Sequence, residues 1–245
     1  MSTSMMEPMA GMSPSLKARI AGALYLIAGE AFSFSENSVR AKLVVLDNAA
    51  ITANNILAHE SLYRRAFAAE ILPFYIVVTI ILYDLLKPVN KSVSLLAAVM
   101  SLMGCAIGTV TSFLHIAPLV ILKGLPSASA FNAEQLQHLA LISLSMGAQI
   151  TNIMMVFFGF YCMLIGYLIL RSSFLPRIIG AFLVLAGVCY QINNFANFLA
   201  LPMATYSFRY IALPSGILGE GSLILWLLLM GVNSKRWYEQ SRATA

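Results

Sequence analysis

Apolar and polar positions follow one another in long blocks, and the apolar blocks are long enough to cross a membrane. A helix needs about 20 predominantly apolar residues to span the hydrocarbon core of a bilayer. The pattern predicts membrane-spanning helices over Ala18–Phe34, Ala66–Leu86, Val93–Leu122, Leu139–Leu170, Ile178–Leu199 and Tyr210–Val232. The third and fourth blocks are longer than a span needs, so we expect these helices to tilt or to project beyond the bilayer.

The composition supports this pattern, because only 10% of the residues are charged and 60% are hydrophobic. A soluble domain needs about a quarter charged residues to cover its surface. The predicted fold class is therefore all-α, a polytopic transmembrane helix bundle of about six membrane-spanning helices. We expect residues 1–16 to be a disordered N-terminal tail, residues 17–234 to be the transmembrane domain and residues 235–245 to be a cytoplasmic C-terminal tail.

The positions of the cations predict the orientation of the helices. A cationic turn follows each even-numbered span, formed by Lys87 and Lys91, by Arg171 and Arg177, and by Lys235, Arg236 and Arg242. Cytoplasmic loops of membrane proteins carry an excess of Lys and Arg, so both termini are predicted to lie in the cytoplasm. The predicted location is the bacterial cytoplasmic (inner) membrane. These flanks account for the net charge of +5, which therefore does not indicate a nucleic-acid partner.

The longest connection on the outer side is residues 35–65. Within it, Asp47 stands where a side chain can cap the start of a short helix. Ile51, Ala58 and Leu62 follow at near-helical spacing, so we expect one amphipathic helix lying in the membrane interface.

Polar residues inside the predicted spans gather at one depth. A helix rises about 1.5 Å per residue, and counting from the cytoplasmic flanks places these residues in the outer half of the bundle. The predicted ligand-pocket residues are Glu220, Asn194, Gln191, Asn197, Glu30, Glu70, His115, Gln149 and Asn152. A carboxylate inside a membrane is costly and faces a cavity or a partner, so we predict an outward-open polar pocket with its floor near Glu220. The alternative is that these side chains only join helices to one another.

One wall of this pocket is predicted from the segment QINNFANF. Gln191, Asn194 and Asn197 are spaced at i, i+3 and i+6, which places them along one side of a helix. The hypothesis requires Asn194 to point into the bundle and to lie near Glu220.

Motifs for metal or nucleophilic chemistry are missing from the sequence. His59 and Glu60 begin like HExxH, but position 63 is Tyr, so the second zinc-binding imidazole is absent. There is no GxSxG, Walker or GxGxxG segment. The isolated cysteines are interpreted as packing residues, and no metal site and no cofactor are predicted. Glu36, Glu60 and Glu134 are interpreted as ordinary loop or interfacial charges.

Gly104 and Gly108 form a GxxxG pair in the third predicted span. Such a pair suits close packing within one bundle, and it also suits a homodimer contact.

Several segments resemble a known family. DNAAITANNILAHESLYRR, LYDLLKPVNKSVSLLAA, FFGFYCMLIGYLILRSSFLPRIIGAFLVLAG and GEGSLILW are similar to a bacterial family of multi-pass membrane proteins described as domain of unknown function 4386. The resemblance implies about six membrane helices and no assigned activity, and Glu220 of GEGS matches the family pattern. The family commonly has His where this chain has Tyr161, and Asp near Asn193. If that pair is catalytic or binds a metal in relatives, the resemblance implies that this chain lacks that activity.

Three functions from different classes fit these observations. The favoured one is binding or transport of a small amphiphilic or lipid-like ligand, because carboxamides recognise hydroxyls and amides while Glu220 supplies one charge or proton. The partners expected are membrane lipid and this ligand. An alternative is an intramembrane enzyme with Glu220 or Glu30 as general base near His115, although no nucleophile, metal or cofactor motif supports it. The third is a structural or accessory membrane subunit.

Overall fold

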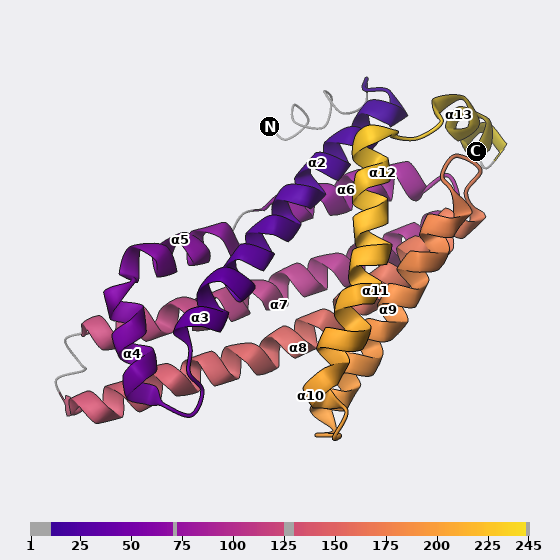
Figure 1. Ribbon diagram of the computed structural model, residues 1–245. Helices are drawn as coiled ribbons and strands as arrows, with labels where there is room; N and C mark the ends of the chain where they lie inside the picture. Colours follow the sequence, from indigo (N-terminus) through magenta and orange to yellow (C-terminus); the bar gives the residue numbers. More distant parts are fainter. Residues whose placement is uncertain (1–10, 71–72, 125–129, 244–245) are drawn as a thin grey trace. The chain divides into compact units, whose positions relative to one another are not determined.

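The computed structural model describes residues 11–70, 73–124 and 130–243, and every regular element among them is helical (Figure 1). The prediction of an all-α fold is confirmed. Backbone N–H and C=O groups inside a bilayer cannot form hydrogen bonds with water. A helix provides these hydrogen bonds within a single segment.

Five helical stretches are long and apolar enough to cross a membrane, which makes the chain a multi-pass membrane protein. They are Glu60–Leu86, Lys91–Lys123, Ala133–Arg171, Arg177–Phe198 and Phe208–Leu229. The first predicted span corresponds to helix α2 (Pro14–Ser33), which is not one of these five. Lys17, Arg19 and Glu30 interrupt its apolar run, so the sixth span stays a prediction.

The remaining helices agree closely with the predicted blocks. Helices α5 (Glu60–Glu70) and α6 (Phe74–Leu86) form the first candidate span, and α7 (Lys91–Lys123), α8 (Ala133–Arg171) and α9 (Arg177–Phe198) form the next three. The last combines η3 (Phe208–Ala212), α11 (Leu213–Gly216), η4 (Ile217–Gly221) and α12 (Ser222–Leu229), after the short α10 (Ala204–Ser207). The segments η3, η4 and η1 (Phe34–Arg40) are π-helical, a conformation found frequently at functional sites.

The chain divides into two compact units, each described by itself. Unit 1 comprises Met1–Leu26, Phe74–Gly104 and Met155–Ala245, and unit 2 comprises Ile27–Pro73 and Cys105–Met154. Helices α2, α7 and α8 contribute residues to both.

In unit 1, helices α8 and α9 pack backbone to backbone at two pairs of glycines. A Cβ on Gly187 would lie 2.6 Å from the carbonyl oxygen of Gly159, and a Cβ on Gly180 would lie 2.7 Å from that of Gly166. Small residues allow membrane helices to approach this closely. Any larger side chain at these four positions would force the two helices apart.

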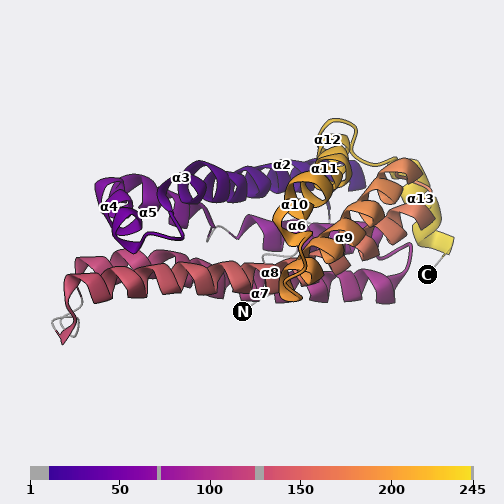
Figure 2. The ribbon, with the colours of Figure 1, turned by 60° about the horizontal axis from the view of Figure 1, so that its bottom comes forward.

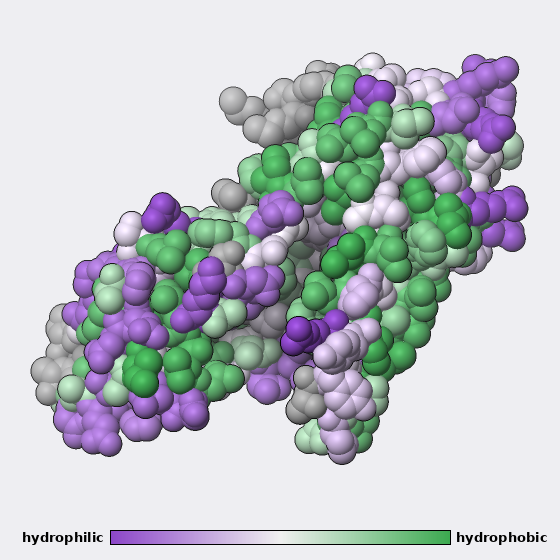
Figure 3. Space-filling model, in the orientation of Figure 1, coloured by the Kyte–Doolittle hydropathy of each residue, from purple (hydrophilic) through white to green (hydrophobic). Residues whose placement is uncertain are grey.

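The surface of unit 1 along α9, α11 and α12 is largely hydrophobic (Figure 3). Ile217 is 66% exposed and Leu229 is 65% exposed. Leu183 and Leu227 are buried in the core, with exposed fractions of 1% and 0%. Apolar side chains on the outside of a long apolar helix are typical of a surface in contact with lipid.

The predicted C-terminal tail, residues 235–245, is helical in most of its length. Gly231, with a positive φ of 69°, ends α12, and α13 (Ser234–Ala243) follows. The indole Nε1 of Trp237 donates a hydrogen bond to the carbonyl oxygen of Leu85, 2.8 Å away, which attaches α13 to α6. At the other end, α2 begins at Pro14, and residues 1–10 of the predicted tail lie outside the described residues.

In unit 2, α3 (Ala41–Leu43), α4 (Ala49–Ala58) and α5 lie over the C-terminal part of α7 and the N-terminal part of α8 (Figures 1 and 2). Val39, Ile56, Tyr63, Leu119 and Leu144 form the buried core between them.

The outer-loop helix α4 differs from its prediction in its cap and in its buried face. The cap is Asn48, which has the extended backbone of an N-cap and accepts a hydrogen bond from the amide of Ile51 at 2.9 Å; Asp47 stands one residue too early. The buried face carries Thr52 and Ile56, whereas Ile51 is 46% exposed. The Thr52 hydroxyl bonds both backbone groups of Val45, and this contact sets which face turns inward.

Candidate functional site

The nine residues predicted to line a pocket fall into both units. Gln191, Asn194, Asn197 and Glu220 belong to unit 1, and Glu30, Glu70, His115, Gln149 and Asn152 belong to unit 2. Contacts within the units bring together two clusters, one around Glu220 and one around Glu70.

The cluster in unit 1 is centred on Glu220 of the π-helical segment η4. Tyr25 of α2 donates a hydrogen bond to Oε2 of Glu220 at 2.8 Å, and Tyr190 of α9 donates one to Oε1. Tyr75 of α6 lies 3.3 Å from the Tyr25 hydroxyl and donates to it. One hydrogen-bonded chain therefore joins α6, α2, η4 and α9 at the Glu220 carboxylate.

The two tyrosines that bind this carboxylate belong to a cluster of aromatic rings. The ring centroids of Tyr25 and Tyr75 are 5.3 Å apart, those of Tyr75 and Phe158 are 5.7 Å apart, and those of Phe158 and Tyr190 are 5.9 Å apart. Tyr161 of α8 joins the same cluster. None of the ion pairs formed within the described ranges includes Glu220.

Gly216 makes the contact between Tyr190 and Glu220 sterically possible. A Cβ at position 216 would overlap the Tyr190 hydroxyl, whereas a Cβ on Gly221 would meet nothing within 4 Å. Gly216 therefore leaves the space that the Tyr190 side chain needs to reach the Glu220 carboxylate.

The carboxamides of Gln191, Asn193 and Asn194 form a second part of this site, and the exposed Asn197 lies outside it. Asn193 is 7% exposed and accepts a hydrogen bond from the Ser207 hydroxyl at 2.8 Å, and Asn194 is 1% exposed. Nε2 of Gln191 donates to the carbonyl oxygen of Val156 at 2.7 Å. Asn197 is exposed and donates to the backbone carbonyl of Asn193.

Two polar atoms of this segment are buried without a hydrogen-bond partner. They are Nδ2 of Asn194, a donor, and Oε1 of Gln191, an acceptor. Leaving a buried polar group unpaired costs about 1–3 kcal/mol, and folded proteins pair nearly all of them. The Asn194 side chain is therefore buried with unused hydrogen-bonding capacity.

The cluster in unit 2 is centred on Glu70 at the end of α5. Ser35 and Arg40 of η1 both donate to Oε1 of Glu70, and Nδ1 of His115 on α7 lies 3.1 Å from Oε2. The side chains of Glu70 and Arg40 are only 6% and 10% exposed. Arg40 also binds Glu36, one helical turn earlier.

The Arg40 guanidinium keeps its charge in this setting. Burial alone would lower the pKa of Arg40, but the hydrogen bonds and charge of Glu36 and the charge of Glu70 raise the pKa above its ordinary value.

His115 makes a second contact besides the one with Glu70, because the Tyr63 hydroxyl donates a hydrogen bond to the backbone carbonyl of His115. Glu70 thus has a cation, an imidazole and a hydroxyl as partners.

The other predicted residues lie outside these clusters. Glu30 and Gln149 are exposed, and Asn152 is half-buried. His115 contacts Glu70, so the structure gives no support to a general-base pair of His115 with Glu30. The parts of the chain described hold no group of three His, Cys, Asp or Glu side chains placed to bind a metal. A Cβ on Gly108 would lie 2.9 Å from Sδ of Met154 in the same chain, while the homodimer stays a prediction.

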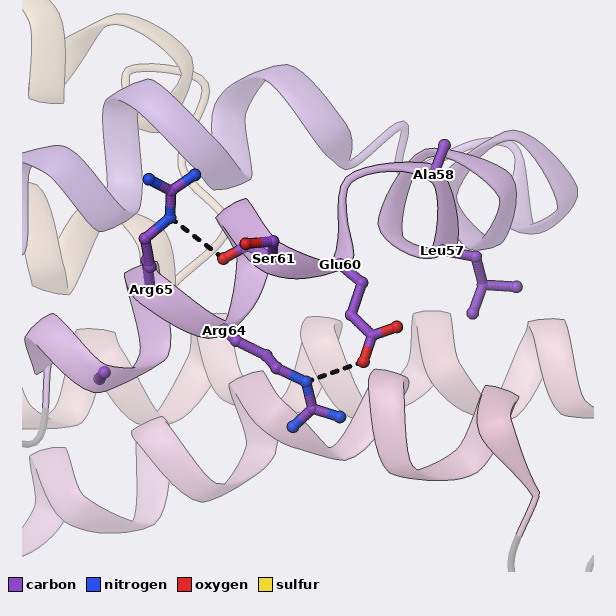
Figure 4. Close-up of a pocket in the computed structure, with 7 residues that line it drawn as sticks. Leu57, Ala58, Glu60, Ser61, Arg64 and Arg65 are labelled. Carbon is purple, nitrogen blue, oxygen red and sulfur yellow. Dashed lines mark hydrogen bonds and ion pairs between the residues drawn. The ribbon is translucent and has the colours of Figure 1, made fainter.

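A shallow surface depression of about 530 Å³ lies on α4 and α5 in unit 2 (Figure 4). It contains none of the nine predicted residues. Glu60 at its edge pairs with Arg64 at 2.8 Å and with Lys123 at 2.7 Å, and Arg65 donates to the carbonyl oxygen of Ser61. Glu60 is thus paired with two cations at this surface.

Glu220 is predicted as a site residue from the sequence, but its aromatic partners are not. Tyr25, Tyr75 and Tyr190 stand in apolar runs, where a tyrosine is easily taken for one more hydrophobic residue. A usable signal was present, because Tyr190 is four residues before Asn194 and therefore lies on the same side of α9.

Comparisons with known proteins identify one relative and one family. The chain is 25% identical over 158 residues to an uncharacterised protein of Archaeoglobus fulgidus, in an alignment that covers 64% of this chain and 76% of that protein. No solved structure matches the chain. The model of a family described as a domain of unknown function (DUF4386) matches residues 20–231. With this match over most of its length, the chain belongs to the DUF4386 family, as its sequence segments predicted.

Proposed function

We propose that this membrane protein binds or transports a small amphiphilic or lipid-like ligand at the polar side of α9. The observation that carries the proposal is the pair of buried, unpaired atoms, Nδ2 of Asn194 and Oε1 of Gln191. A hydroxyl or amide group of a ligand would form a hydrogen bond with either atom. The free energy of this bond, which the unliganded protein does not gain, would favour binding.

The neighbours of Asn194 favour a ligand that is polar at one end. Tyr190 and Asn194 are one helical turn apart on the same side of α9, and the Tyr190 hydroxyl binds Glu220. A polar headgroup near Asn194 would therefore have the Glu220 carboxylate within about one turn of helix.

The adjacent surface suits the apolar end of such a ligand. Ile192 is 41% exposed and Phe195 is 49% exposed, so hydrophobic side chains flank the buried carboxamides on the outside of the same helix. A hydrocarbon tail would lie against them, in the region that lipid occupies in a membrane.

We further propose the topology in which this site works. The cations after α6, α8 and α12 would lie in the cytoplasm, with α2 as a sixth span, in the cytoplasmic membrane of the cell. QINNFANF then lies in the outer half of the bilayer, and the ligand reaches it from the outer leaflet.

The test is native mass spectrometry of the purified full-length chain in a mild detergent, comparing Asn194→Leu with Asn197→Leu. Asn197 is the matched control, because it is an exposed carboxamide on the same helix. The wild type and Asn197→Leu are expected to carry a co-purified amphiphile that Asn194→Leu has lost. The same ligand content in all three proteins, or no ligand in the wild type, would contradict the proposal.

A further inference from the structure

We infer that the ligand of the proposed site is a lipophilic monocation of the ammonium type, which exchanges with a proton on Glu220. This inference rests on the proposed function and specifies its ligand class. It comes from the charge balance and the aromatic surroundings of Glu220, which are independent of the unpaired carboxamides.

The charge balance around Glu220 differs from that of the other partly or fully enclosed carboxylates. Glu70 is paired with Arg40, Asp84 is paired with Lys17 and Lys87, and Glu60 with Lys123. Glu220 receives hydrogen bonds from two neutral phenols and takes part in none of the ion pairs of the described residues. A buried carboxylate must be paired or protonated, so the missing partner is a proton or a cation brought by a ligand.

The rings near Glu220 favour an organic cation. The rings of Tyr25, Tyr75, Phe158, Tyr161 and Tyr190 are linked to one another, and Tyr25 and Tyr190 reach Glu220 through their hydroxyls. The electron-rich faces of aromatic rings attract ammonium groups. Magnesium and calcium instead require about six or more oxygen ligands at short range, which this set does not offer. A carboxylate within an aromatic cluster combines the two features that recognise a quaternary or protonated amine.

Exchange follows from the single carboxylate. When the cation binds to protonated Glu220, the O–H bond breaks, the proton leaves to solvent, and the carboxylate pairs with the cation. Charge is conserved at the site, because one positive charge replaces another.

Glu220 is the one carboxylic acid among the titratable groups of this cluster. The other titratable groups facing it are the phenols of Tyr25, Tyr75, Tyr161 and Tyr190 and the thiol of Cys162. Phenols and thiols are ordinarily neutral at and below about pH 7.5, so a pH dependence of binding reports on Glu220.

The experiment is titration calorimetry of the purified full-length chain with tetraphenylphosphonium, at about pH 7.5 and about pH 5.5. The wild type is expected to bind the cation, and to bind it at least about tenfold more weakly at the lower pH, because the proton competes for Glu220. In weakly buffered solution the wild type should also release a proton as the cation binds.

Three variants complete the test. Glu220→Gln should lose the binding and the proton release, and Tyr190→Phe should weaken the binding while the protein stays folded. Glu239→Gln is the matched control, because Glu239 is exposed on α13, and its affinity should equal that of the wild type. Unchanged affinity in Glu220→Gln, or equal affinity at the two pH values, would overturn the inference.

Failure of the inference of a cationic ligand can be distinguished from failure of the proposed function. If a neutral amphiphile co-purifies and depends on Asn194 while tetraphenylphosphonium does not bind, the proposed function stands and the inference of a cationic ligand falls. If neither is found, both fall.

Discussion

Glu70 and Glu220 are two enclosed carboxylates whose surroundings differ in charge. Glu70 is bound by the guanidinium of Arg40, the hydroxyl of Ser35 and the imidazole of His115. Glu220 is bound by the hydroxyls of Tyr25 and Tyr190. The first carboxylate is fully compensated within the protein and needs nothing more, whereas the second retains a charge for a proton or a ligand to neutralise.

Glu70 and Glu220 should also differ in how much they contribute to stability. Breaking a compensated buried ion pair leaves one charge unpaired, which destabilises strongly. Glu220 is protonated until a cation binds, so replacing its side chain by an amide breaks no ion pair and should leave the fold intact. The effect of substitutions on unfolding should therefore be large around Glu70 and small at Glu220.

The largest effect is expected for Arg40→Leu. Glu70 would then be buried without its cation, and the free energy of unfolding should fall by about 3–5 kcal/mol. Denaturant titration of the purified protein in detergent measures this. The double variant Arg40→Leu with Glu70→Leu should recover part of the loss, and a loss below about 1 kcal/mol in Arg40→Leu would show that the pair is not compensated as described.

A smaller effect is expected for Gly216→Ala, which tests the geometry of the Glu220 cluster. The new methyl group must displace the Tyr190 hydroxyl from Glu220, at a loss of about 1–3 kcal/mol in the free energy of unfolding. Gly221→Ala is the matched control, since its methyl group meets open space, and it should be neutral or stabilising by up to about 1 kcal/mol. Equal losses in the two variants would argue against the overlap with Tyr190.

Glu220→Gln is expected to change the free energy of unfolding by less than about 1 kcal/mol, because the amide keeps the shape and one acceptor for a tyrosine hydroxyl. Glu70→Gln should cost about 2–3 kcal/mol in the same assay, because it leaves Arg40 less compensated. If Glu220→Gln destabilised as much as Glu70→Gln, the two carboxylates would have the same structural role and the contrast would fail.

The smallest effect is expected for Gln149→Ala in α8. Its side chain is exposed, so the free energy of unfolding should change by no more than about 0.5 kcal/mol. The same assay on Asn194→Ala provides the contrast, because that side chain is almost fully buried. A large loss in Gln149→Ala would mean that this residue has a partner within the bundle.

The helices could be predicted because their apolar blocks are long and bounded by cations. Lys91, Arg171 and Arg177 stand at or next to helix ends in the structure, and the predicted ends of the third and fifth spans lie within two residues of the observed ones. The start of α8 lies six residues before its prediction, since Ala133 to His138 are polar enough to be taken for a loop. Composition detects contact with lipid, and it does not detect a helix that extends into water.

The candidate site could be predicted only in part. The burial of Asn194 follows from its spacing along α9, and the importance of Glu220 follows from the rarity of a carboxylate inside an apolar run. The partners of Glu220 could not be found in this way, because Tyr25 is 195 residues from Glu220 and only the folded chain brings them together. The ion pair of Glu70 with Arg40 was missed for a related reason: Arg40 stands in a segment that the sequence presents as a loop.

The two glycine pairs between α8 and α9 limit how a ligand can enter. Carbonyl oxygens and glycine Cα atoms are in direct contact there, so sliding either helix by one turn would press side chains against backbone at both pairs at once. The α8–α9 hairpin therefore acts as the fixed frame of unit 1, and it holds Tyr190 and Asn194 in a constant register. If the site opens, the elements that move must then be α2, α6 or the π-helical turn that carries Glu220. These elements hold Tyr25, Tyr75 and Glu220, which are hydrogen-bonded in one chain to Tyr190 of α9.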